Sequence, residues 1–179
     1  KKYKEIIEQD DYSIKVQPSL LDFISFEAIN YFSKSNRAGF YAYNNIEDNE
    51  WINDKNIFSD YKSFVNTGYS IESKSNSEKA LGVIKDLLKE KSKDKNPYSF
   101  IYADIKRLKI ALKYSSAENK QKLYFNALNN LKKQSSDKEA KQLVNFHIAD
   151  WYIKKGNKTN HTPGDTLKAH YYMEGKKIC

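Results

Sequence analysis

The chain has 179 residues, 14% of them aromatic, and its 31 Lys and Arg against 23 Asp and Glu give a net charge of +8. Its fourteen Tyr and nine Phe supply enough apolar surface for a packed interior, which excludes disorder throughout the chain. Six Gly and three Pro are too few for the many turns of a β-sandwich or β-barrel, so the composition predicts an all-α fold.

The positive charge comes almost entirely from lysine, because arginine occurs only at Arg37 and Arg107. Proteins that bind nucleic acids depend on arginine for bidentate contacts, and the lysines here are spread along predicted helices. Nucleic-acid binding is therefore not expected. No apolar run reaches the roughly 18 residues of a membrane-spanning helix, and a single Cys forms no internal disulfide.

The N-terminal part of the chain has weak periodicity. The segment "QPSLLDFISFEAINYFS" predicts a buried helix whose inner face carries Leu20, Phe23, Ile24, Ala28, Tyr31 and Phe32. The Asn-rich segment after it lacks periodicity, which predicts a long ordered loop held by its aromatic residues Phe40, Tyr41, Tyr43 and Trp51. Helical spacing then predicts a short helix that carries Ile57, Phe58, Tyr61, Phe64 and Val65.

The second half of the chain is more regular. Ser75 with Glu78, and Ser136 with Glu139, can each form a reciprocal capping box, and Pro97 fits the first turn of another helix. The four helices predicted here bury apolar residues at spacings of three and four: Leu81, Ile84, Leu87 and Leu88; Ile101, Ile105, Leu108 and Leu112; Leu123, Tyr124, Ala127, Leu128 and Leu131; and Leu143, Val144, Ile148, Trp151 and Tyr152. The polar turns between them predict antiparallel hairpins packed side by side.

The last predicted hairpin has a more specific spacing. Ala149, Tyr152 and Gly156 match the small, aromatic and glycine positions that close the first helix of a tetratricopeptide-type hairpin, with Gly156 as a left-handed C-cap. Gly175 and Cys179 would then be the small and bulky contact positions of the second helix. The turn between the two helices is expanded to "NKTNHTPGDT".

We therefore expect one helical domain over residues 1–179, an irregular stack of antiparallel hairpins that is tetratricopeptide-like toward the C-terminus. Residues 1–74 form its less regular part, with the aromatic-rich loop, and residues 75–179 form the hairpins. The apolar stripe of the last helix reaches Cys179 with no helix-ending residue after it, so we also expect the chain to be a fragment of a larger protein.

The order of these elements resembles a known family. The "PSLLDFISFEAINYFS" helix is followed by the aromatic loop, a Ser-capped leucine helix, the "YADIKRLKIAL" helix and a tetratricopeptide-like pair that ends in "IC". This order is similar to the helical region before the macroglobulin domains of large bacterial alpha-2-macroglobulin-like proteins. The resemblance implies a non-catalytic module of an exported protein of the protease-inhibitor class, in the cell envelope or periplasm. It would be a structural or protein-interaction region in contact with the remaining domains of the parent chain.

Residues with catalytic or ligand-binding chemistry do not group into a reaction centre. His147, His161 and His170 belong to no zinc motif, and the six Gly form no phosphate-binding loop. His147 and Asp150 can share a helix face, but a nucleophile at Cys179 would have to fold back onto them. We therefore predict a protein that is not an enzyme, with no catalytic residue, no metal and no cofactor.

Aromatic side chains are the candidate partner-contact residues: Tyr41, Tyr43, Trp51, Tyr98, Tyr102 and Tyr124. They can line a concave groove that binds a peptide or glycan, or they can fill the spaces between irregular helices. The first alternative leaves a second function open, a free-standing tetratricopeptide-like scaffold that binds a peptide or protein partner. Helical hairpins after Cys179 would favour that scaffold, and β-rich domains would favour the alpha-2-macroglobulin-like parent.

Overall fold

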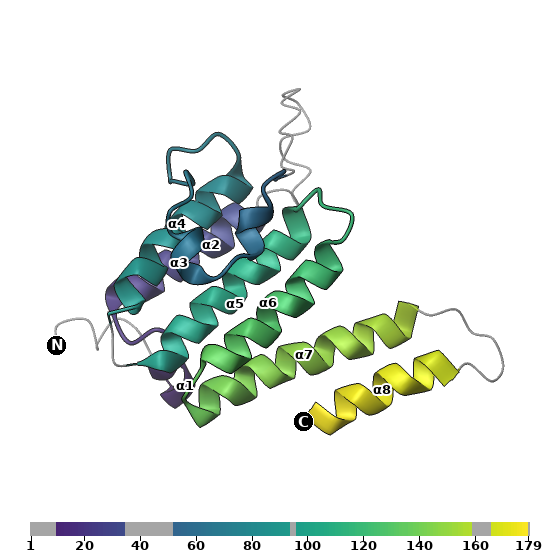
Figure 1. Ribbon diagram of the computed structural model, residues 1–179. Coiled ribbons are helices and arrows are strands. Elements are labelled where there is room, and N and C mark those ends of the chain that lie inside the picture. The colour runs from purple at the N-terminus through teal and green to yellow at the C-terminus, as the bar shows by residue number, and fades with distance from the viewer. Residues whose placement is uncertain (1–9, 35–51, 94–95, 159–165, 179) are drawn as a thin grey trace.

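The computed structural model describes residues 10–34, 52–93, 96–158 and 166–178 (Figure 1). Within these ranges the chain forms eight α-helices and one 3-10 helix, and no β-strand, which confirms the all-α prediction. The elements are α1 (Asp11–Val16), α2 (Leu20–Lys34), η2 (Lys55–Phe58), α3 (Tyr61–Phe64), α4 (Asn76–Lys91), α5 (Pro97–Tyr114), α6 (Lys120–Gln134), α7 (Lys138–Lys158) and α8 (Thr166–Ile178). The short α1 was not predicted.

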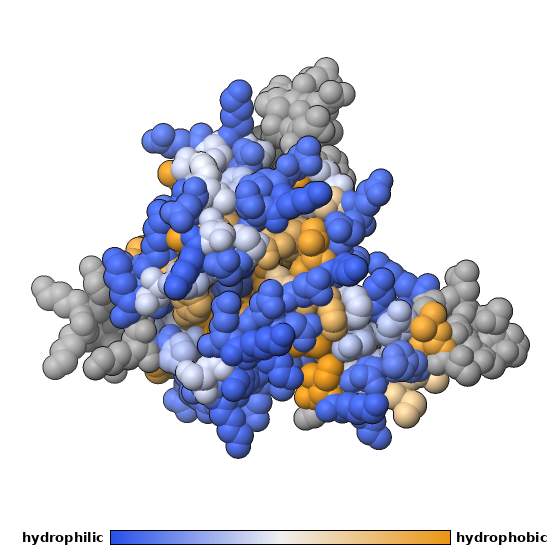
Figure 2. All heavy atoms as spheres, viewed as in Figure 1, coloured by the Kyte–Doolittle hydropathy of each residue, from blue (hydrophilic) through white to orange (hydrophobic). Residues whose placement is uncertain are grey.

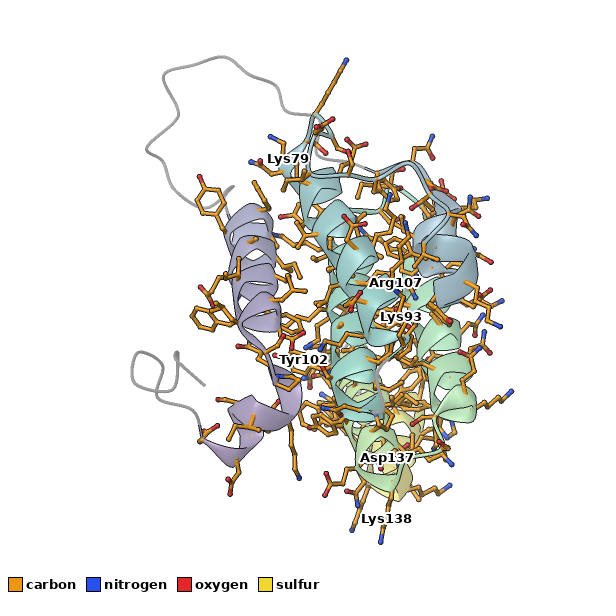
Figure 3. The ribbon with its side chains drawn as sticks, turned by 90° about the vertical axis from the view of Figure 1, so that its left-hand side faces the viewer. Lys79, Lys93, Tyr102, Arg107, Asp137 and Lys138 are labelled. Atoms are coloured by element: carbon orange, nitrogen blue, oxygen red, sulfur yellow. The ribbon has the colours of Figure 1, made fainter. Side chains whose placement is uncertain are left out.

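The helices are arranged around α5, which packs against α1, η2, α4, α6 and α7. In Figure 1, α5 and α6 run side by side in opposite directions. From the lower end of α6, α7 diverges to the right, and α8 returns along it. Figure 3 shows α2 on one side of α4 and α5, with η2, α3 and α6 on the other side.

A continuous core of buried apolar side chains extends from α1 to α7. Its completely buried members include Leu81 and Ile84 of α4, Leu108 of α5 and Leu128 of α6. Hydrophilic residues cover most of the face seen in Figure 2, and apolar residues show between them. The predicted stripes of the second half therefore lie in the core or against it, as periodicity placed them, although α7 also exposes Phe146 and Ile153, at 62% and 44%.

The helix starts of the second half follow from local hydrogen bonds. Ser75 and Glu78 form the predicted capping box at α4. The Asn96 side chain caps α5, with Pro97 in its first turn. At α7 the prediction was wrong, because the Asp137 carboxylate accepts the hydrogen bond from the Ala140 amide at 2.7 Å and takes the place of the predicted capping box.

The buried face of α2 differs from the predicted one. Phe26 and Ile29 are each 1% exposed, whereas Ile24 and Tyr31 of the predicted stripe are 55% and 68% exposed. Apolar residues occur on both sides of this helix, so periodicity did not distinguish the inner side from the outer side.

A buried ion pair explains which side of α2 faces inward. Lys91 of α4 approaches the Asp22 carboxylate to 2.7 Å, and both side chains are almost completely buried. Asp22 also accepts hydrogen bonds from the Ser19 amide and hydroxyl, and its own amide donates to the Ser19 hydroxyl. The pair therefore turns the Asp22 side of α2 toward α4.

The single helix predicted around residues 56–66 is divided into η2 and α3. Ser59 is extended, and the Asp60 carboxylate accepts hydrogen bonds from the amides of Lys62 and Ser63, which starts a new helix at Tyr61. Asp60 thus divides the single helix that the apolar spacing predicted.

The α7–α8 hairpin is closely packed at its two glycines. A Cβ atom on Gly156 would lie 3.1 Å from the Tyr172 ring, and one on Gly175 would lie 3.4 Å from the Ala149 carbonyl oxygen. The predicted C-cap at Gly156 was wrong, because α7 continues to Lys158 without a left-handed residue there. The four aromatic residues of the predicted loop lie outside the described residues, as do His161 and Cys179.

Candidate functional site

A groove of about 710 Å³ lies between α5, α6 and the C-terminal half of α7. The residues of α7 in its lining belong to the part of the helix that diverges from α5 and α6 in Figure 1. The charged residues of its lining are one aspartate, Asp150, and five lysines: Lys109, Lys113, Lys154, Lys155 and Lys158. Leu112, Gln121, Tyr124 and Trp151 complete the lining.

Helical spacing places the lysines in two rows. Lys109 and Lys113 are four residues apart on α5, and Lys154 and Lys158 are four residues apart on α7. Because α7 continues past Gly156, its last turn adds Lys158 to the groove. Lysine is also favourable in this last turn, where it meets the negative end of the helix dipole.

Few contacts within the structure offset this positive charge. Lys154 pairs with Asp150 at 2.6 Å, and Lys113 donates a hydrogen bond to the Ser33 carbonyl of α2 at 2.9 Å. Within the described ranges, Lys109 and Lys158 make no ion pair. Five lysines against one aspartate therefore leave four positive charges in the lining without a carboxylate.

Burial and the nearby charges also shift the pKa values of side chains in and near the groove. Loss of water around the ammonium group lowers the pKa of Lys109, and the charge of Lys106 one turn earlier lowers it further. Burial lowers the pKa of His147 on α7 to about 4, and the positive charge of Lys109 contributes to that decrease. Burial and the charge of Asp150 raise the pKa of Tyr124. His147 is therefore neutral at pH 7.

The aromatic rings of the groove are engaged by neighbouring side chains. Trp151 stacks on Phe125 with ring centroids 4.3 Å apart, and the Tyr152 ring meets it edge-on at 5.2 Å. The Lys155 ammonium lies 5.5 Å from the Trp151 centroid. Tyr124 is only 4% exposed. These rings contribute to the walls of the groove and leave little free face for another ring.

The predicted partner-contact aromatics lie in different places. Tyr124 lines the groove. Tyr98 and Tyr102, one turn apart on α5, are half-buried and meet Tyr12 of α1 and Phe26 of α2 edge-on at 6.5 and 5.2 Å. The other three, Tyr41, Tyr43 and Trp51, lie outside the described residues. The structure thus does not unite Tyr98, Tyr102 and Tyr124 in one site.

Tyr98 belongs to a smaller hollow at the other end of α5. This hollow, of about 410 Å³, is lined by residues of α1, α5 and α7. Within it, Lys15 of α1 pairs with Glu139 of α7 at 2.9 Å, with both side chains exposed by half or more. Its lining also contains Asp11, so two carboxylates face one lysine, in contrast to the excess of lysines in the lysine groove.

Two further observations concern the described part of the chain. It holds no cluster of three or more His, Cys, Asp or Glu side chains placed to bind a metal ion. None of its helices has the length and hydropathy needed to cross a membrane.

Sequence reasoning did not find the groove. The signal available was the spacing of the lysines on the two helices, which the sequence shows only as lysines spread along predicted helices. Spacing shows that residues share a face of one helix, but not which other helix that face meets. In comparisons with protein-family models, with curated proteins and with solved structures, no significant match to this chain was found.

Proposed function

We propose that this chain is a non-catalytic helical scaffold that binds a protein or peptide partner in the lysine groove between α5, α6 and α7. The observation that carries the proposal is the groove itself, an open hollow of about 710 Å³ with residues from three helices in its lining. Concave surfaces between packed helices are common binding sites for extended peptides.

The packing of the surrounding helices supports a binding role. Each of the three helices that line the groove is anchored in the core by buried residues, among them Leu108, Leu128 and Ile148, so the helices are held in place before a ligand arrives. A site held in this way loses less conformational entropy on binding than a site that must first form. The polar side chains of the lining can then select the ligand by their charge.

A peptide-library selection tests this proposal. Random peptides would be selected on the immobilised chain, and the enriched peptides would be studied by hydrogen exchange. The proposal expects enriched peptides to compete with one another and to slow exchange in residues 109–113 and 150–158. The disrupting variant is Leu112→Glu, which would place a negatively charged side chain in the lysine-rich groove and abolish binding. Absence of enrichment, or protection confined to other helices, would contradict a binding groove.

The family resemblance supports a second, more specific proposal, that the scaffold belongs to an exported alpha-2-macroglobulin-like protein in the cell envelope or periplasm. Its support is the order of helices described above, with a close-packed α7–α8 pair at Gly156 and Gly175. In such a protein the partner would be another domain of the same chain. The gene sequence around this segment tests it, because an export signal upstream and β-rich domains downstream are both required.

A further inference from the structure

The lysines of the groove are placed so that one ligand can reach several of them. Lys109 and Lys113 stand on α5, Lys154 and Lys158 stand on α7, and all four side chains are exposed. Of these, Lys154 alone is paired with a carboxylate in the described structure, that of Asp150. A negatively charged ligand between the two helices would reduce the mutual repulsion of the ammonium groups.

The shape of the groove and its aromatic rings favour a peptide over other anions. Single-stranded nucleic acid binds by stacking its bases on free aromatic faces, but Trp151 is covered by Phe125 and Lys155, and Tyr124 is buried. A flat membrane surface cannot enter a concave groove between helices. Leu112 adds a half-buried apolar side chain to the lining, which suits an apolar residue between acidic ones.

We infer that the lysine groove binds an acidic peptide segment of a protein partner, with carboxylates that meet Lys109 and Lys158 and an apolar side chain that lies on Leu112. The inference rests on the proposed function, because it names the ligand class of the same groove. Lys109 and Lys158 are the informative residues, since neither has an ion pair within the described ranges that a ligand would have to displace.

A peptide-binding measurement tests the inference. The probe is a short fluorescein-labelled peptide of Glu-Glu-Leu repeats, and the matched probe is a peptide of Gln-Gln-Leu repeats. Fluorescence anisotropy at low and high salt gives the affinities. In a Trp51→Phe background Trp151 is the remaining tryptophan, so a change in its emission on peptide addition reports binding at the groove.

Charge reversal distinguishes the groove from the general positive charge of the protein. Lys109→Glu with Lys158→Glu changes the groove, whereas Lys62→Glu with Lys89→Glu changes two exposed lysines on α3 and α4 by the same net charge. The groove variant should bind the Glu-Glu-Leu peptide at least about tenfold more weakly than the unmodified chain, and the control variant should stay within about threefold. If the groove variant misfolds by circular dichroism, Lys109→Gln with Lys158→Gln replaces it.

The outcomes separate this inference from the proposed function. Salt-sensitive binding of the Glu-Glu-Leu peptide that changes Trp151 emission and is lost only in the groove variant supports the inference. Equal binding of the Gln-Gln-Leu peptide overturns the inference but leaves a peptide-binding groove. Equal loss in both charge variants, or displacement of the peptide by lower concentrations of oligothymidylate, overturns it as well. If neither these probes nor library peptides bind, both proposals fail.

Discussion

Arg107 is the largest side chain that the described structure buries completely, at 1% exposure. Its Nε donates to the Asp104 carboxylate at 2.6 Å, and its Nη1 donates to the carbonyls of Ile57 and Ser59 at 2.8 and 2.9 Å. The guanidinium also lies over the Phe64 ring, 4.7 Å from its centroid. Arg107 therefore joins α5 to η2 and α3, on the side of α5 that faces η2 in Figure 3.

Loss of Arg107 should be costly because it leaves a buried carboxylate without its counter-charge. We expect Arg107→Met to lower the free energy of unfolding by about 3 to 5 kcal/mol. Adding Asp104→Leu should recover part of this loss but leave about 2 kcal/mol, because the carbonyls of Ile57 and Ser59 still lack their donor. Urea denaturation of the two variants measures both values. A double variant as stable as the original chain would show that the carbonyl contacts contribute nothing.

His147 should make the protein less stable in mild acid. Burial lowers its pKa to about 4 in the folded chain, against 6.5 for a solvated imidazole, so the unfolded chain binds more protons between these values. The stability that its neutral form contributes is complete above pH 6.5 and is lost as the pH falls toward 4. Between about pH 7 and about pH 5 the free energy of unfolding should fall by about 2 kcal/mol.

Substitution of the histidines isolates this effect. Urea denaturation at the two pH values should show that His147→Gln removes most of the pH dependence. The matched control, His170→Gln, changes an exposed histidine of α8 and should preserve it. If the free energy of unfolding of His147→Gln still falls by the same amount between the two pH values, other groups cause the acid sensitivity.

At the scale of the elements, α4 approaches the segment before it closely at Gly82. A Cβ atom on Gly82 would lie 2.3 Å from the Ser70 carbonyl carbon, a backbone atom that cannot move away without displacing the segment. We expect Gly82→Ala to cost about 3 kcal/mol or to prevent folding, although alanine is the better helix former. Gly68→Ala is the matched control, because its Cβ atom would enter open space, and the midpoint of urea unfolding should change little. Equal midpoints for the two variants would contradict this packing.

The elements also show what the sequence could and could not predict. Helices α4 and α5 were predicted well because local signals agree, with a capping box at Ser75, a proline after Asn96 and an apolar stripe on each helix. In α2 the signals conflict, because apolar residues occur on both sides and the choice between them depends on Lys91, which is distant in sequence. Pairings of this kind are not visible in the spacing of one helix.

The candidate site was less predictable than the fold for the same reason. Aromatic residues were chosen because of their chemistry, yet Tyr98 and Tyr102 are used largely in contacts with Tyr12 and Phe26. The groove depends instead on the angle between α5 and α7, which the packing of several helices determines together. A single sequence does not show which residues of different helices are in contact, so it does not give the angle between α5 and α7.

At the scale of the whole molecule, a single core should make unfolding cooperative from α1 to α7. Stacked hairpins that contact only their neighbours can unfold in separate steps, but here α5 packs against five other elements and the core is continuous. We expect one urea transition, with the same midpoint by far-ultraviolet circular dichroism and by Trp151 fluorescence in the Trp51→Phe background. Two separated transitions would show that the α7–α8 hairpin unfolds independently.

Because α7 diverges from α6, a small tilt at one end of α7 gives a larger displacement at its other end. The fixed end of α7 is the one near Ala140, a residue with no exposed surface that packs α7 against the core. Lys158 stands 18 residues further along the helix, about 27 Å away at 1.5 Å per residue. If α7 tilted by about 5° at Ala140, Lys158 would move by roughly 2 Å, because it lies about 27 Å away along the helix. A bulkier side chain at Ala140 would therefore change the distance between the lysine row of α5 and the lysine row of α7. It would do so from the opposite end of α7, without contacting either row.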